Sequence, residues 1–265
     1  TAAEVGCNTF LLEKSNELGG LASLISKIPA KNRLADFPHY LMHRAEQLDN
    51  LYIFKNTEGT PENIRKFHPN IIVSSTGSAP LLPPIAGLKD RIDNENHNIY
   101  SILGMISHIN DFPKDLEGKK VVVVGGGAVG LDVVEFFADR NADISIVEMM
   151  DQIGRDLDPV SKNDTKTMMK KHNVHQLTKT ALLEVKDSSF LVKGDGEPYE
   201  LPFEYGFVCL GMRAQGQLYQ NLTEEFSSED VEIMNIGDSQ RARRIIDGTQ
   251  EGRNILTVLE QKGYL

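Results

Sequence analysis

The clearest chemical pattern in the sequence is a glycine-rich run followed, 18 residues after its last glycine, by an acidic residue. The run is Gly125-Gly126-Gly127-Ala128-Val129-Gly130, and the acid is Glu148. In a G-x-G-x-x-G loop the first glycine permits a tight turn, the second lets a pyrophosphate approach the backbone, and the third lets helix and strand pack closely. A carboxylate placed like that of Glu148 accepts hydrogen bonds from ribose hydroxyls and repels a 2′-phosphate. The pattern predicts a dinucleotide site, with a glycine-rich turn of another α/β fold as the alternative.

This chemistry requires a strand before the loop, a helix that begins at the loop, and a second strand that ends at the acid. Lys120–Val124 is a β-branched run of the kind that is buried on both faces of a parallel sheet. Residues 128–140 carry apolar side chains at helical spacing, and residues 144–147 form a short apolar run directly before Glu148. The N-terminus of such a helix offers free N–H groups and a partial positive charge to a phosphate. The sequence therefore places all three supporting elements in the required order.

Apolar runs alternate with helical stretches along the rest of the chain, which favours an α/β fold class. Strands are predicted directly before a glycine at residues 71–76, 207–210 and 231–236. A hairpin is predicted from residues 190–192 and 199–201, a closing helix over residues 245–262, and a connecting loop over the polar residues 89–98.

An internal repeat links the start of the chain to the glycine-loop unit. Residues 6–13 (GCNTFLLE) match residues 141–148 (NADISIVE), because in each a helix ends, a short turn follows, an apolar strand runs four residues and a glutamate closes it. The offset of 135 places the equivalents of Gly125, Gly127 and Gly130 at positions −10, −8 and −5, ahead of Thr1. We expect the chain to begin inside the helix of a second dinucleotide-binding unit that lacks its first strand and glycine loop. Chance similarity is the alternative.

Composition and charge exclude several classes of protein. The 265 residues carry 28 Lys and Arg against 38 Asp and Glu, and the formal charge of −10 argues against nucleic acid as a partner. No apolar run approaches the ~20 residues of a membrane span. No secretory signal is visible, so a cytoplasmic location without membrane contact is expected. The two cysteines, Cys7 and Cys209, are far apart, and the chain has neither a C-x-x-C motif nor a metal-ligand set.

Several motifs stand in a fixed order over nearly the whole chain. They are Leu12-Glu13-Lys14 with Leu18-Gly19-Gly20, residues 75–80 (STGSAP), residues 124–130 with Glu148, Val208-Cys209-Leu210-Gly211, Gly237-Asp238, and residues 244–252. This order resembles the pyridine nucleotide-disulfide oxidoreductase type of flavoprotein fold, and within it the C-terminal module of the 2-enoate reductase and 2,4-dienoyl-CoA reductase family of NADH:flavin oxidoreductases. The resemblance implies an α/β fold with two Rossmann-like domains, the inner one inserted into an outer one that is truncated at its N-terminus.

The resemblance also implies domain limits, cofactors and a partner. Residues 1–103 and 229–265 would form an outer domain for FAD or, as in some members, only ADP, and residues 104–228 an inner NAD-binding domain. In that family a separate N-terminal barrel carries FMN, an iron–sulfur cluster and the substrate site, and this missing barrel is an expected partner. Open strand edges in a truncated outer domain would favour a homo-oligomer as well.

Site residues follow from the resemblance by position. The NAD-binding residues are Gly125, Gly126, Gly127, Ala128, Val129, Gly130, Glu148 and Gly211, and the FAD-binding residues are Glu13, Lys14, Gly19, Gly20, Thr76, Gly77, Gly237 and Asp238. Glu13 would hold the adenosine ribose, Thr76 and Gly77 would mark the crossover between domains, and Asp238 would bond the ribityl or pyrophosphate region. No catalytic side chain and no metal are expected, because hydride transfer is the chemistry of the cofactors themselves. The redox cysteine pair of disulfide reductases is absent.

Two functions remain open at this point. The first is an NADH-dependent flavin oxidoreductase module that passes electrons from NADH through FAD to a flavin or iron–sulfur centre on the missing barrel, with an unidentified final acceptor. The second is a non-catalytic module that binds NAD or ADP. For both, Glu148 predicts NADH over NADPH, and the absent first glycine loop predicts that the chain by itself binds FAD weakly.

Overall fold

The computed structural model describes residues 1–265 and divides into two compact units. Unit 1 comprises Thr1–Ser26, Lys31–Ala79 and Met212–Leu265, and unit 2 comprises Lys27–Ala30 and Pro80–Gly211. Unit 2 is thus inserted into unit 1. The junctions fall at residues 79/80 and 211/212, which differ from the predicted 103/104 and 228/229.

Pairing and packing explain where the junctions fall. The segment before residue 103 belongs to unit 2 because β5 (Ile99–Tyr100) pairs with β12 (Tyr205–Val208) in the main sheet of that unit. The segment after residue 211 belongs to unit 1 because α8 (Gln217–Glu225) packs on β14 (Glu232–Asn235). Both contacts are long-range, so composition along the chain did not reveal them.

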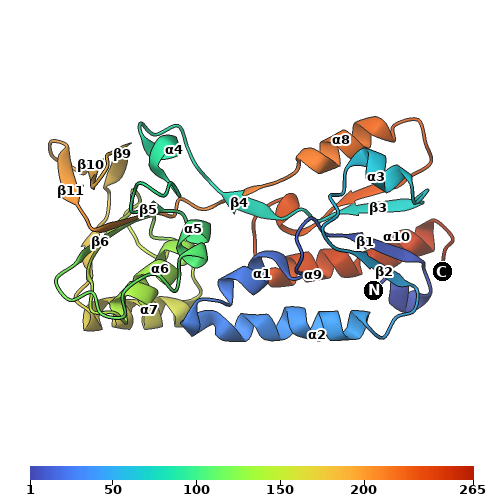
Figure 1. The fold of residues 1–265 in the computed structure, drawn as a ribbon, viewed down its shortest axis with the longest axis horizontal. Helices are drawn as coiled ribbons and strands as arrows, with labels where there is room; N and C mark the ends of the chain where they lie inside the picture. The colour runs from blue at the N-terminus through green and yellow to red at the C-terminus, as the bar shows by residue number, and fades with distance from the viewer. The chain divides into compact units, whose positions relative to one another are not determined.

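Unit 2 is built on a five-stranded parallel sheet in the order β5-β12-β6-β7-β8. Strands β5 and β6 of this sheet are labelled in Figure 1. Strands β6 (Lys120–Val124) and β7 (Asp143–Val147) flank α6 (Ala128–Ala138) in sequence, which confirms the predicted strand–helix–strand order. Helix α6 packs on one face of the sheet. The antiparallel sheet of β9, β10 and β11 packs on the other face through a buried cluster that includes Val122 and Val124. Parallel strands covered on both faces form nearly continuous apolar runs, as the four buried valines of β6 after Lys120 do.

The remaining elements of unit 2 surround this sheet. They are α4 (Leu88–Arg91), α5 (Ile102–Ser107), α7 (Pro159–Lys171), β8 (His175–Leu177), β9 (Ala181–Val185), β10 (Ser189–Lys193) and β11 (Tyr199–Pro202). Strands β10 and β11 pair as the predicted hairpin. Helix α4 corrects the loop predicted over residues 89–98, because Leu88 is fully buried and anchors a short helix at the start of that polar segment.

Unit 1 contains two separate two-stranded parallel sheets. Strand β1 (Thr9–Leu12) pairs with β2 (Leu51–Phe54), and β3 (Ile71–Ser74) pairs with β14. Strands β4 (Ser78–Pro80) and β13 (Met212–Ala214) pair with each other. The other elements of the unit are η1 (Ala3–Val5), α1 (Gly20–Ile25), η2 (Pro29–Ala35, which begins in unit 2), α2 (Asp36–Ala45), α3 (Pro61–Arg65), η3 (Gly237–Ser239), α9 (Ile245–Arg253) and α10 (Ile255–Gln261).

The helix predicted over residues 245–262 is interrupted. It ends at Arg253, and α10 begins at Ile255. Gly252 and Asn254 are weak helix formers, so the helix breaks where they fall close together. No helix in either unit is both long and apolar enough to cross a membrane.

The core of unit 1 is small compared with that of unit 2. Its buried apolar side chains are Ala3, Pro38, Ile72, Leu222, Phe226, Ile255 and Leu259, whereas all the other buried apolar side chains of the chain lie in unit 2. Phe10 and Leu11 of β1 are 40% and 38% exposed, and Val73 of β3 is 41% exposed. Strands in the interior of a parallel sheet do not normally leave such side chains in water.

The eight-residue repeat also exists in the backbone. Gly6 and Asn141, 135 residues apart, both adopt left-handed conformations, with φ of 99° and 60°. Each leads into a parallel strand, and each strand ends directly before a glutamate, Glu13 after β1 and Glu148 after β7. The two segments therefore share a turn, a strand and an acidic end.

Candidate dinucleotide-binding sites

The turn between β6 and α6 requires glycine at two positions. Gly125 has φ of +109°, and a Cβ there would lie 2.1 Å from the carbonyl oxygen of Cys209. A Cβ on Gly130 would lie 1.9 Å from the carbonyl oxygen of Gly125. Gly125 thus lies in a turn that its positive φ requires, as predicted for the first glycine, and Gly130 allows the close approach of helix and loop predicted for the third.

The second glycine of the motif faces open space. A Cβ on Gly127 would meet nothing within 4 Å, and Gly127 and Ala128 are exposed. No side chain caps the 11-residue helix α6 that begins at Ala128, so its first N–H groups are available to a ligand. An uncapped helix N-terminus behind an open glycine loop suits a pyrophosphate. The residues of this loop therefore fit the phosphates of a dinucleotide.

Glu148 is fixed at the end of β7 by two backbone hydrogen bonds. Its Oε2 accepts from the N–H of Gly126 at 2.7 Å, and its Oε1 accepts from the N–H of Met150 at 2.8 Å. Each carboxylate oxygen has a second lone pair, so hydroxyl donors can still be bound. The structure thus brings Glu148 and the glycine loop together as predicted.

Two features beside this loop were not predicted. The N–H of Gly154, which has φ of +66°, donates to the carbonyl of Gly126 at 2.7 Å and ties the segment after Glu148 to the loop. The same segment, through Asp151 and Ile153, lines a pocket of about 570 Å³ together with Lys162 and Lys166 of α7 and Gln176 of β8. An isolated glycine and residues from separate elements gave no pattern that could have revealed either feature.

Gly211 follows β12 in unit 2. It has φ of +102°, nothing lies within 4 Å of a Cβ built on it, and its carbonyl accepts from the N–H of Leu81 at 2.9 Å. No hydrogen bond joins Gly211 to the glycine loop. Its role in binding NAD therefore remains a proposal.

In unit 1, Glu13 ends β1 as Glu148 ends β7. Its Oε1 accepts from the N–H and the Oγ of Ser15, both at 2.8 Å. Lys14 is exposed beside it. Gly19 and Gly20, with φ of 103° and 50°, begin the short helix α1 further along. The first group of residues proposed for the flavin side thus lies in one continuous segment.

A second group gathers at the carboxyl ends of β3 and β14. Thr76 Oγ1 donates to the carbonyl of Gln215 at 2.5 Å, and the N–H of Gln215 donates to the carbonyl of Gly77 at 2.9 Å. Asp238 Oδ2 accepts from Ser78 Oγ at 3.0 Å. Parallel neighbours end at one edge of a sheet, which explains why these distant residues meet.

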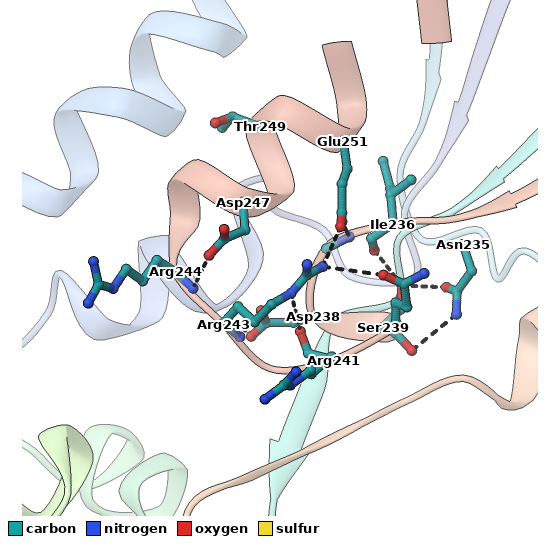
Figure 2. Close-up of polar contacts among 12 residues, drawn as sticks. Asn235, Ile236, Asp238, Ser239, Arg241, Arg243, Arg244, Asp247, Thr249 and Glu251 are labelled. Atoms are coloured by element: carbon teal, nitrogen blue, oxygen red, sulfur yellow. Dashed lines mark hydrogen bonds and ion pairs between the residues drawn. The ribbon is translucent and has the colours of Figure 1, made fainter. Parts of the chain in front are cut away.

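The loop of Gly237 and Asp238 is held from α9 (Figure 2). The N–H of Gly237 donates to Glu251 Oε2 at 2.6 Å, and Arg243 Nη2 donates to Glu251 Oε1 at 2.6 Å. The Gly237 N–H, and after it the Arg243 guanidinium, hold the pKa of the Glu251 carboxyl below its usual value. The same carboxylate raises the pKa of Arg243. Glu251 is a positioning residue that sequence reasoning missed, because nothing in its spacing of 14 from Gly237 forms a known motif.

Ser239 completes this loop from the inside. It is 1% exposed, and its Oγ lies 2.7 Å from Asn235 Oδ1 and 2.6 Å from the carbonyl oxygen of Ile236 (Figure 2). Arg241 and Arg244 make no ion pair, whereas Arg243 is engaged by Glu251. The three arginines therefore differ in their environment, although they are neighbours in the sequence.

The two groups in unit 1 supply only part of a flavin dinucleotide site. No hydrogen bond joins the Glu13 segment to the Gly77 and Asp238 group, and no strand of unit 1 leads through a glycine loop into an uncapped helix of the length of α6. Residues 1–265 therefore provide an acidic group for a ribose in unit 1, but no cradle for the two phosphates of FAD.

The cysteines cannot act together within a unit. Cys209 is buried at the end of β12 in unit 2, and burial raises the pKa of its thiol to about 12. Cys7 is half-buried and belongs to unit 1. No three His, Cys, Asp or Glu side chains are grouped so that they could hold a metal ion.

Comparison with known proteins places this architecture in a family. The pattern of the pyridine nucleotide-disulphide oxidoreductase family matches residues 41–234, and the chain belongs to that family. It is 26% identical to an NADH oxidase of Thermoanaerobacter brockii over 95% of this chain and 37% of that protein. It is also 26% identical to a metal reductase of Desulforamulus reducens over 96% of this chain and 40% of that protein. The chain thus spans about two fifths of the length of these relatives.

Solved structures share the fold. A 2-naphthoyl-CoA reductase in complex with 2-naphthoyl-CoA superimposes with a TM-score of 0.79 at 23% sequence identity, over 95% of this chain and 36% of that chain. The likeness, together with the family, confirms the α/β class with Rossmann-like units that the motif order predicted.

Proposed function

We propose that this chain is the NADH-binding, electron-transferring part of an NADH-dependent flavin oxidoreductase. The observation that carries the proposal is the open, uncapped N-terminus of α6 behind Gly127, with Glu148 fixed beside it. Membership of the pyridine nucleotide-disulphide oxidoreductase family supports it, as do relatives described as an NADH oxidase and a metal reductase.

The residues of unit 2 would bind and orient the cofactor. The first N–H groups of α6 and the N–H of Gly127 would donate to the phosphates, and Glu148 would accept from the adenosine ribose. When bound, the reduced nicotinamide supplies a hydride to an acceptor, and the chain need supply no acid or base for that transfer. The negative charge of Glu148 would exclude a 2′-phosphate and so favour NADH over NADPH.

The finer part of the proposal concerns the acceptor. FAD on the unit 1 side, associated with Glu13, Thr76, Gly77 and Asp238, would relay electrons to a flavin or iron–sulfur centre carried outside residues 1–265. The support is that the chain spans only 37% and 40% of two relatives that are described as reducing or oxidising enzymes. Lys14, Gly19, Gly20 and Gly237 are proposed on the same grounds.

A second candidate is a non-catalytic module that binds NAD or ADP. The observation in its favour is that unit 1 alone forms no phosphate cradle, so flavin has no complete site in these residues. Protein colour and cofactor release distinguish the two. A yellow protein that releases FAD on denaturation, and whose flavin is bleached by NADH in a stopped-flow experiment, supports the electron-transfer module. A colourless protein that still binds NADH supports the binding module, and a yellow protein that NADH does not bleach rejects the electron-transfer role.

A further inference from the structure

Strand β8, at the end of the parallel sheet in unit 2, has an open edge. It is the last strand of that sheet and pairs only with β7. The carbonyl of Leu177 accepts from the N–H of Glu148, so the backbone groups of Leu177 face β7. Because these groups alternate between the two sides of a strand, the N–H and the carbonyl of Gln176 face away from β7. Gln176 is exposed, and such an edge can pair with another strand.

Two adjoining cavities follow this edge and the neighbouring helix α7. The cavity of about 570 Å³ described above reaches Thr178 at the carboxyl end of β8, and a second cavity of about 730 Å³ is lined by His175 at the other end. Lys166 and Gln176 line both cavities, as does Met169, which is 5% exposed. The two cavities therefore form one continuous surface feature within unit 2, which we call the β8–α7 groove.

Three lysines, each one helical turn from the next, line the β8–α7 groove. Lys162 and Lys166 line the cavity at the carboxyl end of β8, and Lys166 and Lys170 line the other. None of the three forms an ion pair within the chain, whereas Lys186 of the same unit does. Asp151 is the one acidic residue in the lining of either cavity. The groove is thus a locally positive surface on a chain whose net charge is −10.

An extended peptide matches both the open edge and the row of lysines. Alternate side chains of a strand point to the same face and lie about 6–7 Å apart. Lysines four residues apart on a helix are separated by a rise of about 6 Å. Carboxylates on every second residue of an added strand would therefore meet successive lysines on the side of α7, while its backbone pairs with Gln176. A small anion would meet the lysines but would leave this edge of β8 unpaired.

We propose that the β8–α7 groove binds an extended acidic segment of a partner protein, which adds a strand at the edge of β8 and places carboxylates of alternate residues against Lys162, Lys166 and Lys170. In binding of this kind the main-chain hydrogen bonds supply affinity, and the alternate side chains supply specificity. Lys166 and Lys170 are exposed, so each ion pair contributes little by itself and the row as a whole selects an acidic sequence. The inference does not depend on the binding of NADH.

A synthetic peptide tests the proposal on the 265-residue chain. The probe is a fluorescein-labelled peptide of about eight residues in which Glu and Thr alternate, and binding is measured by fluorescence polarisation. A version with Gln in place of Glu should bind about tenfold more weakly or worse, because it lacks the charges. A version methylated on the backbone nitrogens that would face β8 should be weakened to a similar degree, because it cannot pair. Absence of binding by the acidic peptide up to about 1 mM would overturn the proposal.

Two lysine variants locate the site. Lys166→Gln removes the charge that both cavities share and should weaken binding of the acidic peptide about threefold to tenfold. Lys171→Gln is the matched control, because it removes an exposed charge from the same helix that lines neither cavity, and it should leave binding unchanged. Thermal midpoints close to that of the unsubstituted chain would show that both variants fold. Equal weakening by the two substitutions would reveal only a general attraction between charges, and would overturn the proposal.

Amide hydrogen exchange distinguishes strand addition from the binding of a small anion. With the acidic peptide bound, exchange of the Gln176 N–H should slow by about tenfold or more, as expected when an open edge becomes paired. Tripolyphosphate, used as the small-anion probe, should leave this exchange unchanged. A peptide that binds without protecting Gln176 would show that the groove attracts anions without pairing with them, and would overturn the proposal.

Discussion

The carboxylate of Glu148 holds the backbone of Gly126, since its Oε2 accepts from the Gly126 N–H at 2.7 Å. The group proposed to bind ribose and the loop proposed to bind phosphate are therefore one hydrogen-bonded assembly. A Cβ on Gly126 would lie 3.0 Å from the same Oε2, so the close approach also restricts this position to a small residue. A substitution of Glu148 or Gly126 should therefore affect both the binding of the ribose and the binding of the phosphates.

The first prediction concerns the choice of nicotinamide cofactor. A 2′-phosphate beside the Glu148 carboxylate would place like charges in contact, so the chain should bind NADH about tenfold to a hundredfold more tightly than NADPH. Glu148→Gln removes the charge and keeps a side chain that can still accept from one backbone N–H. In this variant the ratio of NADH affinity to NADPH affinity should therefore be smaller, as measured by calorimetric titration of both cofactors. Equal affinities in the unsubstituted chain would reject the assignment.

The glycine loop provides a second prediction with a matched pair of variants. Gly127 has φ of −80°, which alanine adopts freely, and a Cβ there meets nothing within 4 Å. Gly127→Ala should fold with a thermal midpoint close to that of the unsubstituted chain and lose about tenfold or more in NADH affinity, because its Cβ occupies the space through which the phosphates approach.

Gly130→Ala should behave in the opposite way. Its Cβ would lie 1.9 Å from the Gly125 carbonyl oxygen, which forces α6 away from β6 and should cost about 3 kcal/mol or more of stability. Thermal unfolding and NADH titration of both variants check the pair. Normal NADH binding by Gly127→Ala would show that no ligand approaches the loop there.

The sequence predicted the features that depend on residues close together in the chain, and it did not predict those that depend on contacts between distant segments. The strand–loop–helix–strand order around Gly125 and Glu148 was predictable because periodicity and glycine spacing are local signals. The contacts of Gly154 with Gly126, and of Glu251 with Gly237, were not, because each depends on two segments that meet only in the folded unit. The junction at residue 80 was missed for the same reason.

The third prediction uses the lowered pKa of Glu251. A carboxyl whose pKa is lower in the folded chain contributes stability above its unfolded pKa, and this contribution is lost as the pH falls through the folded value. At pH 7 the unsubstituted chain should therefore be more stable than Glu251→Gln, by no more than about 1 kcal/mol because the pair is partly exposed. The difference should shrink at acidic pH, as the carboxyl of the unsubstituted chain becomes protonated. Urea unfolding at both pH values measures it, and a difference that grows on acidification would contradict the assignment.

The fourth prediction concerns the two thiols. Burial and a pKa of about 12 keep Cys209 protonated and inaccessible, whereas Cys7 is half-buried. Iodoacetamide at pH ~8 should modify Cys7 alone in the folded chain, because the thiolate is the reactive form. Both should react in denaturant, which serves as the control. Mass spectrometry after digestion identifies the modified residue, and rapid labelling of Cys209 in the folded chain would show that the end of β12 opens to solvent.

The last prediction compares the two cofactors on the 265-residue chain. Unit 2 contains both the glycine loop and the free N-terminus of α6, so calorimetry should detect NAD binding. Unit 1 has the carboxylate of Glu13 but no equivalent loop, so two or three charge-assisted hydrogen bonds to the FAD phosphates are missing. Each contributes about 1.5–3 kcal/mol. At about 1.4 kcal/mol per factor of ten, their loss should weaken FAD binding by several powers of ten. Submicromolar FAD binding by this chain would show that unit 1 holds the phosphates in some other way, whereas loss of NAD binding as well would show that the glycine loop of unit 2 is not a nucleotide site.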